Sequence, residues 1–192
     1  MSDKQPLHVN VQGGKFKGKK LLLPPLEITR STKSILKSSY FNTVQFDIVD
    51  SIFIEAFGGS GSMGLEAISR GAKSAYFIEQ NREAFEVLKK NIKSFENIDT
   101  VPILGDTFIE LPKLLKTLNQ RAYIYLDPPF DFRDDMDDIY EKCFKMVKNF
   151  SKERVLLLTF EHSSKVQMPN KIGSFELQKS KTFGNSTLSY YM

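Results

Sequence analysis

Apolar residues recur along this chain with two alternating periods. From residue 52 onward, apolar runs of strand length alternate with stretches in which apolar side chains return every three to four positions. The first pattern predicts buried β-strands and the second predicts amphipathic α-helices. The predicted strands are 52–57, 74–79, 100–104, 122–127, 155–161, 174–183 and 186–192. The predicted helices are 61–71, 81–95, 107–118 and about 135–149.

This order of elements predicts an α/β fold. Strands that alternate with helices form a mostly parallel sheet with helices on both faces. The last two of the seven strands have no helix between them, and Gly184-Asn185 at their junction suits a tight hairpin turn. The seven-stranded sheet is therefore expected to finish with an antiparallel hairpin.

The first 30 residues follow a different pattern. Short extended pieces over 7–23 surround three glycines and stop at Pro24-Pro25, which favours an arm or small hairpin. Helical spacing of apolar residues then begins near Ser31 or Thr32, and either residue can cap a helix. We therefore expect a basic N-terminal arm over 1–30 and a main domain over 31–192.

Length and composition narrow the class of protein. A chain of 192 residues can bury a sufficient core without disulfides, and its single cysteine, Cys143, cannot pair within the chain. The sequence has no cluster of Cys and His with metal-ligand spacing, no signal-peptide pattern at its start, and no apolar run near 20 residues. We expect a monomeric cytoplasmic protein that binds neither metal nor membrane.

The positive charge is concentrated at the N-terminal end. Residues 1–40 hold eight Lys and Arg against two acidic residues, a net charge of +6, whereas residues 41–192 hold 19 against 21, a net of −2. Such asymmetry is typical of an arm that contacts a polyanion. A solvated basic tail without a ligand is the alternative interpretation.

A glycine-rich loop indicates a nucleotide-type cofactor. Gly59-Ser60-Gly61-Ser62-Met63-Gly64 follows a predicted strand and opens a predicted helix, whose N-terminus offers N–H donors. Glu79 ends the next predicted strand, where a carboxylate can accept both ribose hydroxyls. These features fit a nicotinamide dinucleotide about as well as S-adenosylmethionine.

Two further acidic residues favour S-adenosylmethionine. Glu55 lies four residues before the loop, where this cofactor would bring a cationic amino group and sulfonium. Asp106 follows the third strand and could accept a hydrogen bond from the adenine amino group. Each has a simpler interpretation: Glu55 as a solvent-facing strand residue, and Asp106 as the N-cap of the helix that begins at Thr107.

The tetrapeptide Asp127-Pro128-Pro129-Phe130 carries the candidate chemistry. It stands at the carboxyl end of the fourth strand, the edge at which open α/β sheets bind ligands. An exocyclic base amine is a poor nucleophile, so it must be held in line by two hydrogen-bond acceptors. The Asp127 carboxylate and the Pro128 carbonyl can supply them, while Phe130 stacks on an unstacked base. A diproline turn with an incidental aspartate is the alternative.

The whole pattern resembles the RsmD-type bacterial methyltransferases that modify guanine N2 in 16S ribosomal RNA. The segments that carry the resemblance are GGKFKGKKL (13–21), EAFGGSGSMGLEAISRGA (55–72), GDTF (105–108), DPPF (127–130) and KTFGNSTLSYY (181–191). The resemblance implies a Rossmann-like class I methyltransferase that acts on small-subunit particles. It implies S-adenosylmethionine contacts from Glu55, Phe57, Gly58, Gly59, Ser60, Gly61, Gly64, Glu79, Gln80, Asp106 and Thr107, and RNA contacts from Lys15, Lys17, Lys19, Lys20, Arg30, Thr32 and Lys37.

The chain departs from this family pattern at several positions. Glu55 replaces the usual aspartate, and Ser31, Ile35 and Lys37-Ser38 replace a proline, an arginine and an Arg-Glu pair. The last three changes lie on the expected RNA side, so they bear on substrate identity more than on reaction type. An adenine-N6 methyltransferase, a nicotinamide-dependent reductase and a noncatalytic RNA-binding module remain as alternatives.

Overall fold

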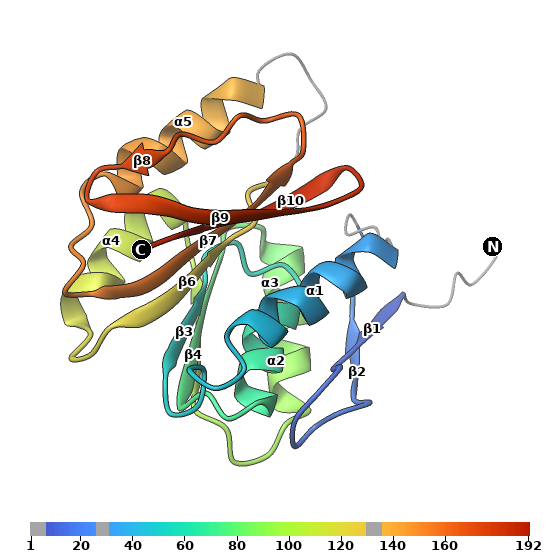
Figure 1. Cartoon of the computed structure of the whole chain (residues 1–192). Coiled ribbons are helices and arrows are strands. Elements are labelled where there is room, and N and C mark those ends of the chain that lie inside the picture. Colours follow the sequence, from blue (N-terminus) through green and yellow to red (C-terminus); the bar gives the residue numbers. More distant parts are fainter. Residues whose placement is uncertain (1–6, 26–30, 130–135) are drawn as a thin grey trace.

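The protein is a three-layer α/β structure with a small hairpin attached to one side (Figure 1). The computed structural model describes residues 7–25, 31–129 and 136–192, with the backbone alone described for 31–32 and 136–138. Among the helices in these ranges, none is both long and apolar enough to cross a membrane. The predicted α/β class is confirmed, as is the mostly parallel sheet with an antiparallel end.

The elements follow the predicted order closely. The strands are β1 His8–Asn10, β2 Lys20–Leu22, β3 Ile52–Glu55, β4 Ser74–Glu79, β5 Thr100–Leu104, β6 Ala122–Leu126, β7 Val155–Ser163, β8 Lys171–Ile172, β9 Phe175–Phe183 and β10 Ser186–Tyr191. The helices are α1 Ser31–Thr43, α2 Ser62–Ser69, α3 Arg82–Lys93, α4 Thr107–Thr117 and α5 Met136–Val147.

The order of strands in the sheet places the ligand-binding edge. The main sheet runs β5-β4-β3-β6-β7-β10-β9-β8, with β3 to β7 parallel and β10 antiparallel to β7. After β3 the chain builds outward in one direction and then returns to build β6 and β7 in the other. Such a reversal opens a crevice at the carboxyl ends of the strands, which here lies between β3 and β6.

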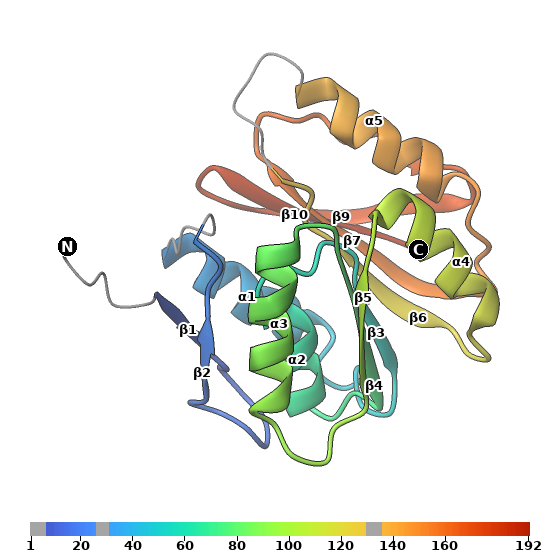
Figure 2. The same cartoon turned by 180° about the vertical axis from the view of Figure 1, so that it is seen from behind.

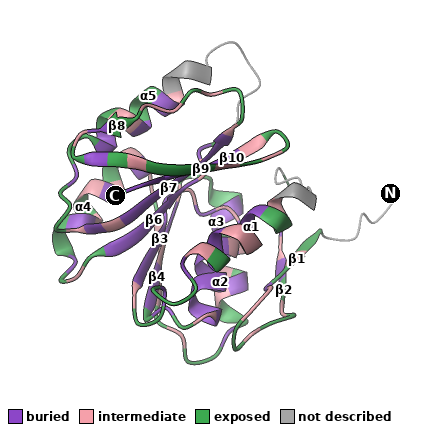
Figure 3. Ribbon diagram, viewed as in Figure 1, coloured by how far each residue is buried: buried purple, intermediate pink, exposed green. Residues whose placement is uncertain are grey.

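Two buried clusters cover the two faces of the sheet. Helices α1, α2 and α3 pack on one face around Phe53, Phe77 and Tyr125, and helices α4 and α5 pack on the other around Ile54 and Leu126 (Figure 2). Figure 3 shows the buried strands enclosed between these layers. Successive residues of β3 and β6 point to opposite faces, and both are apolar because both faces are covered.

The N-terminal hairpin packs against the domain. Strands β1 and β2 pair with each other alone, and Val11 and Leu21 enter the same cluster as α1, α2 and α3. The buried Asn91 of α3 accepts a hydrogen bond from the Leu22 amide and donates one to the Leu22 carbonyl, each at 2.9 Å. The hairpin is therefore fixed to α3 by both apolar and polar contacts.

One strand differs from the seven predicted ones. The two-residue strand β8 adds an eighth strand beside β9, too short to leave an alternating pattern in the sequence. The β9–β10 turn is confirmed at Gly184-Asn185, since Phe183 pairs with Ser186 and Gly184 has a φ of +61°. A positive φ at this position is what a two-residue hairpin turn requires.

Candidate functional site

A cavity of about 1150 Å³ opens at the carboxyl edge of the sheet. It is bounded by the ends of β3, β4, β6 and β7, by the glycine loop, and by α1 and the N-terminal hairpin. The predicted residues on its wall are Lys17, Lys37, Glu55, Phe57, Gly58, Gly59, Glu79, Gln80, Thr107, Asp127, Pro128 and Pro129. The fold thus brings residues more than 100 positions apart into one hollow.

Glu55 ends β3 and caps the first turn of α2. Its carboxylate accepts hydrogen bonds from the amide nitrogens of Met63, at 3.2 Å, and Gly64, at 2.8 Å. A carboxylate at a helix N-terminus satisfies otherwise unpaired N–H groups and the positive end of the helix dipole. Glu55 is therefore a buried residue on the cavity wall, which excludes the alternative of a solvent-facing strand position.

Three glycines of the loop, Gly58, Gly61 and Gly64, have two different roles. Gly58 approaches the Ile78 carbonyl closely: a Cβ atom on it would lie 3.2 Å from that oxygen. Gly61 and Gly64 turn toward the core instead, where added Cβ atoms would lie 2.5 Å from Leu88 and 2.3 Å from Phe77. Gly64 lets α2 pack closely on β4, Gly61 lets the loop approach α3, and neither glycine lies on the cavity wall.

Ser60 also lies away from the cavity wall. It is buried, and its carbonyl accepts a hydrogen bond from the Asn91 side chain at 2.8 Å. Cofactor contact by Ser60, Gly61 and Gly64 therefore stays a prediction, and all three residues are buried and lie off the cavity wall. Ser62 and Met63, which the sequence analysis passed over, take their place on the wall.

Glu79 ends β4 with its carboxylate beside the glycine loop. It accepts hydrogen bonds from the amide nitrogens of Gly59 and Asn81, both at 2.7 Å. Each carboxylate oxygen can accept more than one hydrogen bond, so both can also accept from a ligand hydroxyl. Gln80 follows on the same wall. Glu79 therefore fixes the loop and presents acceptors to the cavity.

Asp106 is the N-cap of α4. Its side chain accepts a hydrogen bond from the Phe108 amide at 2.9 Å, and the residue does not line the cavity. The adjacent Thr107 does line it and donates its hydroxyl to the Ala56 carbonyl. Phe57 lies on the wall as well and packs edge-on against Phe108. The capping interpretation of Asp106 is thus confirmed, whereas an adenine contact stays a prediction.

Asp127 and the two prolines form the wall of the cavity at the end of β6. The Lys33 ammonium of α1 lies 3.2 Å from Asp127 Oδ2, with 41% and 22% of the two side chains exposed. Neither proline has an N–H to donate to the carboxylate. Phe130, the predicted stacking residue, lies outside the described residues. Lys33, on helix α1, therefore orients Asp127, which follows strand β6 of the sheet.

Tyr125 and Glu161 form a second polar pair in the same wall. The Tyr125 hydroxyl donates to Glu161 Oε2 at 2.7 Å, and both side chains are buried. Burial, together with the negative charges of Glu161 and Asp127, raises the pKa of Tyr125 well above its ordinary value. The hydroxyl therefore stays protonated and remains a donor.

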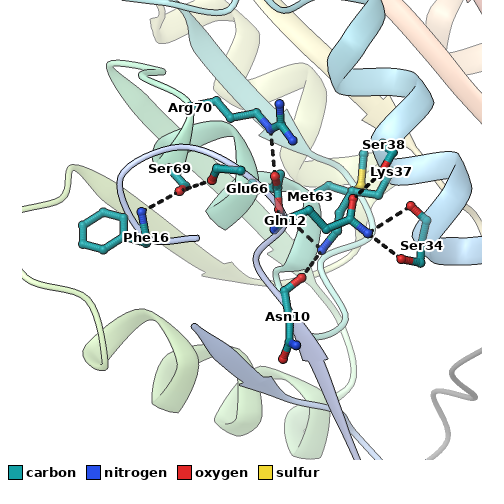
Figure 4. Close-up of polar contacts among 12 residues, drawn as sticks. Asn10, Gln12, Phe16, Ser34, Lys37, Ser38, Met63, Glu66, Ser69 and Arg70 are labelled. Carbon is teal, nitrogen blue, oxygen red and sulfur yellow. Dashed lines mark hydrogen bonds and ion pairs between the residues drawn. The ribbon is translucent and has the colours of Figure 1, made fainter. Parts of the chain in front are cut away.

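A buried polar network joins the hairpin, α1 and α2 at the cavity wall (Figure 4). At its centre the fully buried Glu66 carboxylate accepts from Arg70 Nε and from the Gln12 amide, each at 2.7 Å. Lys37 Nζ lies 3.6 Å from the same carboxylate and donates to the Asn10 carbonyl at 2.9 Å. Burial lowers the pKa of Lys37, although Glu66 and Glu55 oppose this shift.

Lys37 therefore corrects one expectation for the RNA surface. Only 3% of the residue is exposed, and its ammonium is held inside this network. It joins elements of the fold and is not available to an approaching phosphate. Helical spacing could have indicated this, because Lys37 follows the buried Leu36 and stands three residues before the buried Tyr40.

The remaining basic residues of the arm lie on the hairpin. Lys15, Lys17 and Lys20 are exposed, and Lys17 reaches the rim of the cavity. Lys19 is half-buried and lies over the Phe95 ring, 4.7 Å from its centroid. Arg30 and the Thr32 side chain lie outside the described residues. The hairpin thus carries an exposed positive charge, of which Lys17 reaches the cavity.

The sequence analysis missed Lys33, Tyr125 and Glu161, for identifiable reasons. Lys33 is one of many polar residues of α1, and only the tertiary packing brings it to Asp127. Glu161 was the last residue of a predicted strand, so the rule that strand ends form the site could have found it. Within the described ranges, no three His, Cys, Asp or Glu side chains are grouped to hold a metal ion.

Comparison with known proteins identifies the family. A family model described as "Conserved hypothetical protein 95" matches residues 9–192. A candidate rRNA methyltransferase of Bacillus subtilis, YlbH, is 25% identical over 189 residues, which cover 95% of this chain and 98% of that protein. Ribosomal RNA small subunit methyltransferase D of Haemophilus influenzae is 30% identical over 125 residues, or 65% of each chain.

Solved structures agree on the architecture. A candidate methyltransferase from Escherichia coli superposes with a TM-score of 0.76 over 96% of this chain and 97% of its own, at 23% identity. This similarity supports the class I methyltransferase fold. With a family model that spans nearly the whole chain, the protein belongs to the family described as conserved hypothetical protein 95, the RsmD-type family that its sequence resembles.

Proposed function

We propose that this protein transfers a methyl group from S-adenosylmethionine to the exocyclic N2 amine of a guanine in 16S ribosomal RNA. The observation that carries the proposal is the single cavity in which the glycine loop, Glu55, Glu79 and the Asp127-Pro128-Pro129 turn meet. The relatives named as small-subunit rRNA methyltransferases support the RNA substrate.

The first turn of α2 supports S-adenosylmethionine over a dinucleotide. A pyrophosphate would use the N–H groups at a helix N-terminus, but the Glu55 carboxylate already accepts from Met63 and Gly64 there. A second anion beside Glu55 would be repelled, whereas a cationic amino acid group would be attracted. Glu79 would accept the ribose hydroxyls, and the Gly58 backbone lies on the same cavity wall.

The chain's own residues would hold the target amine in position. The cofactor supplies an electrophilic methyl group on a sulfonium. Asp127 and the Pro128 carbonyl would accept the two amine hydrogens and orient its lone pair, and Lys33 holds Asp127 in the cavity. Neither group needs to act as a strong base, since the methylated amine is acidic enough to lose its proton to water.

The basic hairpin would bind the RNA backbone. Lys17 reaches the rim of the cavity, and Lys15 and Lys20 are exposed on the same hairpin, so a phosphate backbone bound to the hairpin would bring its bases toward the opening. The relatives' names support a ribosomal target, and we expect an assembled small-subunit particle as the substrate.

The decisive experiment measures transfer of labelled methyl to small-subunit particles from cells that lack the protein. We expect label in guanine N2, located by mass spectrometry, and its loss in Asp127→Ala. The exposed Asp99 offers a matched control, and Asp99→Ala should retain activity. Label in adenine would instead identify the protein as an adenine-N6 methyltransferase.

Two outcomes would reject methyl transfer itself. Calorimetric binding of NADH without binding of S-adenosylmethionine would support a reductase. Binding of RNA with no transfer in the labelled assay would support a noncatalytic module. Either result would leave the observed fold unchanged, because similar folds carry different functions.

A further inference from the structure

We propose that Glu161 selects the target base by accepting a hydrogen bond from guanine N1–H while Asp127 accepts from the N2 amine. The inference rests on the proposed function and adds a residue that recognises the substrate. It starts from a buried carboxylate on the cavity wall that methyl transfer alone does not require.

The two carboxylates lie on neighbouring parallel strands in matching positions. Leu126 of β6 pairs with Phe160 of β7, so Asp127 and Glu161 follow as the next pair along the strands. Side chains of such a pair point to the same face, and the two strands lie about 4.8 Å apart. Both residues line the cavity. Two acceptors therefore stand side by side at the base-binding end.

Each carboxylate is matched to a different donor of the protein. Lys33 Nζ lies 3.2 Å from Asp127 Oδ2, and the Tyr125 hydroxyl donates to Glu161 Oε2 at 2.7 Å. These donors offset the electrostatic repulsion between the two carboxylates. A charged carboxylate only accepts hydrogen bonds, and its two oxygens together accept about four. The pair can therefore accept from a ligand as well.

This arrangement fits the edge of guanine better than that of adenine. Guanine presents two adjacent donors, N1–H and the N2 amine, in one plane. Adenine presents its N6 amine beside N1, a bare acceptor that would face the Glu161 carboxylate without a hydrogen. A buried acceptor opposite another acceptor is strongly unfavourable. Glu161 would thus both attract guanine and reject adenine.

A purely structural role for Glu161 is the competing explanation. The buried Tyr125 hydroxyl needs an acceptor, and Glu161 provides it. If Glu161 only accepted the hydrogen bond from Tyr125, its charge would not affect which base is methylated. The amide oxygen of a glutamine at this position would then accept from Tyr125 equally well. The two explanations differ in whether the selectivity for the base changes when the carboxylate is replaced.

The test compares guanine with 2-aminopurine, which keeps the amine at C2 but has no hydrogen on N1. Small-subunit particles are reconstituted with ligated RNA that carries either base at the methylated position, and kcat/KM is measured for both. The wild-type protein should prefer guanine by about tenfold or more, the worth of one hydrogen bond to a charged acceptor. In Glu161→Gln the preference should fall toward one, because the amide can donate to the bare N1.

The matched control is Tyr125→Phe, which removes the donor to Glu161 but keeps the carboxylate. It should preserve the preference for guanine even where kcat falls. Equal use of both bases by the wild-type protein would overturn the inference without any variant, as would an unchanged preference in Glu161→Gln. In both cases Asp127-dependent methylation of guanine would persist, so the proposed function would stand. Absence of all methyl transfer would instead defeat the proposed function.

Discussion

Replacing Glu66 by glutamine tests whether the buried network at the cavity wall holds the hairpin to the domain. The substitution keeps the size of the side chain and removes its charge. Arg70 and the Gln12 amide lose a charged acceptor, and Lys37 Nζ loses its ion-pair partner at 3.6 Å. A glutamine NH2 must also face at least one N–H donor there. The variant therefore leaves a nearly buried ammonium without its main counter-charge.

The expected destabilisation follows from the burial of the partners. Breaking a buried ion pair by removing one partner costs about 3–5 kcal/mol, and both Glu66 and Lys37 are at least 97% buried by side-chain area, with exposures of 0% and 3%. For a domain of this length, that cost lowers the melting temperature by about 6–20 °C. Lys37→Met in the same variant should recover part of the loss, because the isolated charge is gone.

The loss of unfolding free energy in Glu66→Gln should also depend on pH. Burial holds the pKa of Lys37 below its ordinary value of 10.5, and Glu66 opposes this shift. Without Glu66 the pKa of Lys37 in the folded state falls further. Between that lowered pKa and 10.5 the unfolded chain binds more protons than the folded one, so the free energy of unfolding rises with pH. The difference between the variant and the wild type should therefore shrink as the pH approaches 10.5.

Urea unfolding followed by circular dichroism measures both effects. The matched control is Glu110→Gln, which removes the partner of Lys113 from an exposed pair at 2.9 Å. An exposed pair of this kind contributes about 0–1 kcal/mol. This account of the network would be refuted if Glu66→Gln lost no more unfolding free energy than Glu110→Gln. It would also be refuted if the loss in Glu66→Gln grew with pH.

Three further predictions concern packing, RNA binding and the single cysteine. Gly64→Ala should destabilise the protein by about 1–3 kcal/mol in urea unfolding, because a Cβ would lie 2.3 Å from Phe77; a gain in stability would contradict the close packing of α2 on β4. Lys15→Ala with Lys17→Ala should weaken RNA binding and flatten its salt dependence by about two phosphate contacts; an unchanged slope in filter binding would remove the hairpin from the RNA site. Burial raises the pKa of the Cys143 thiol to about 12, so this thiol should react with an aromatic disulfide far more slowly in the native protein than in the urea-unfolded protein. Equal reaction rates in the two states would show that the core around Cys143 opens in the native protein.

Local sequence signals predicted the helices and strands because, in each element, the hydrophobic pattern and the flanking turn residues indicate the same structure. The strands 74–79 and 100–104 match β4 and β5 residue for residue, since short apolar runs between polar turns leave few alternatives. The glycine loop and the Asp127 turn were found for the same reason. The family resemblance added the RNA substrate and the individual cofactor and RNA contacts, which periodicity and charge alone leave open.

What the sequence could not predict depends on tertiary packing. Gly61 and Gly64 belong to the same motif as Gly58, yet they face Leu88 and Phe77, and only the packing of α2 separates the two roles. Helical spacing marks Lys37 as a position facing the core, but its ion-pair partner Glu66 lies 29 residues later in the chain and is identified only by the packing of α1 on α2. Charge and motif spacing show which groups are available, whereas the direction of each side chain is set by packing.

The contacts of the hairpin also constrain the order in which the chain can mature during synthesis. Gln12, Leu22 and Lys19 bond to groups 54, 69 and 75 residues later in the chain. The N-terminal segment therefore leaves the ribosome long before its partners on α2 and α3 exist, and Val11 and Leu21 have no apolar surface to cover them until then. Non-local contacts of this kind form late and slow folding, so the packing of the hairpin would be completed only after the first half of the nascent chain has emerged.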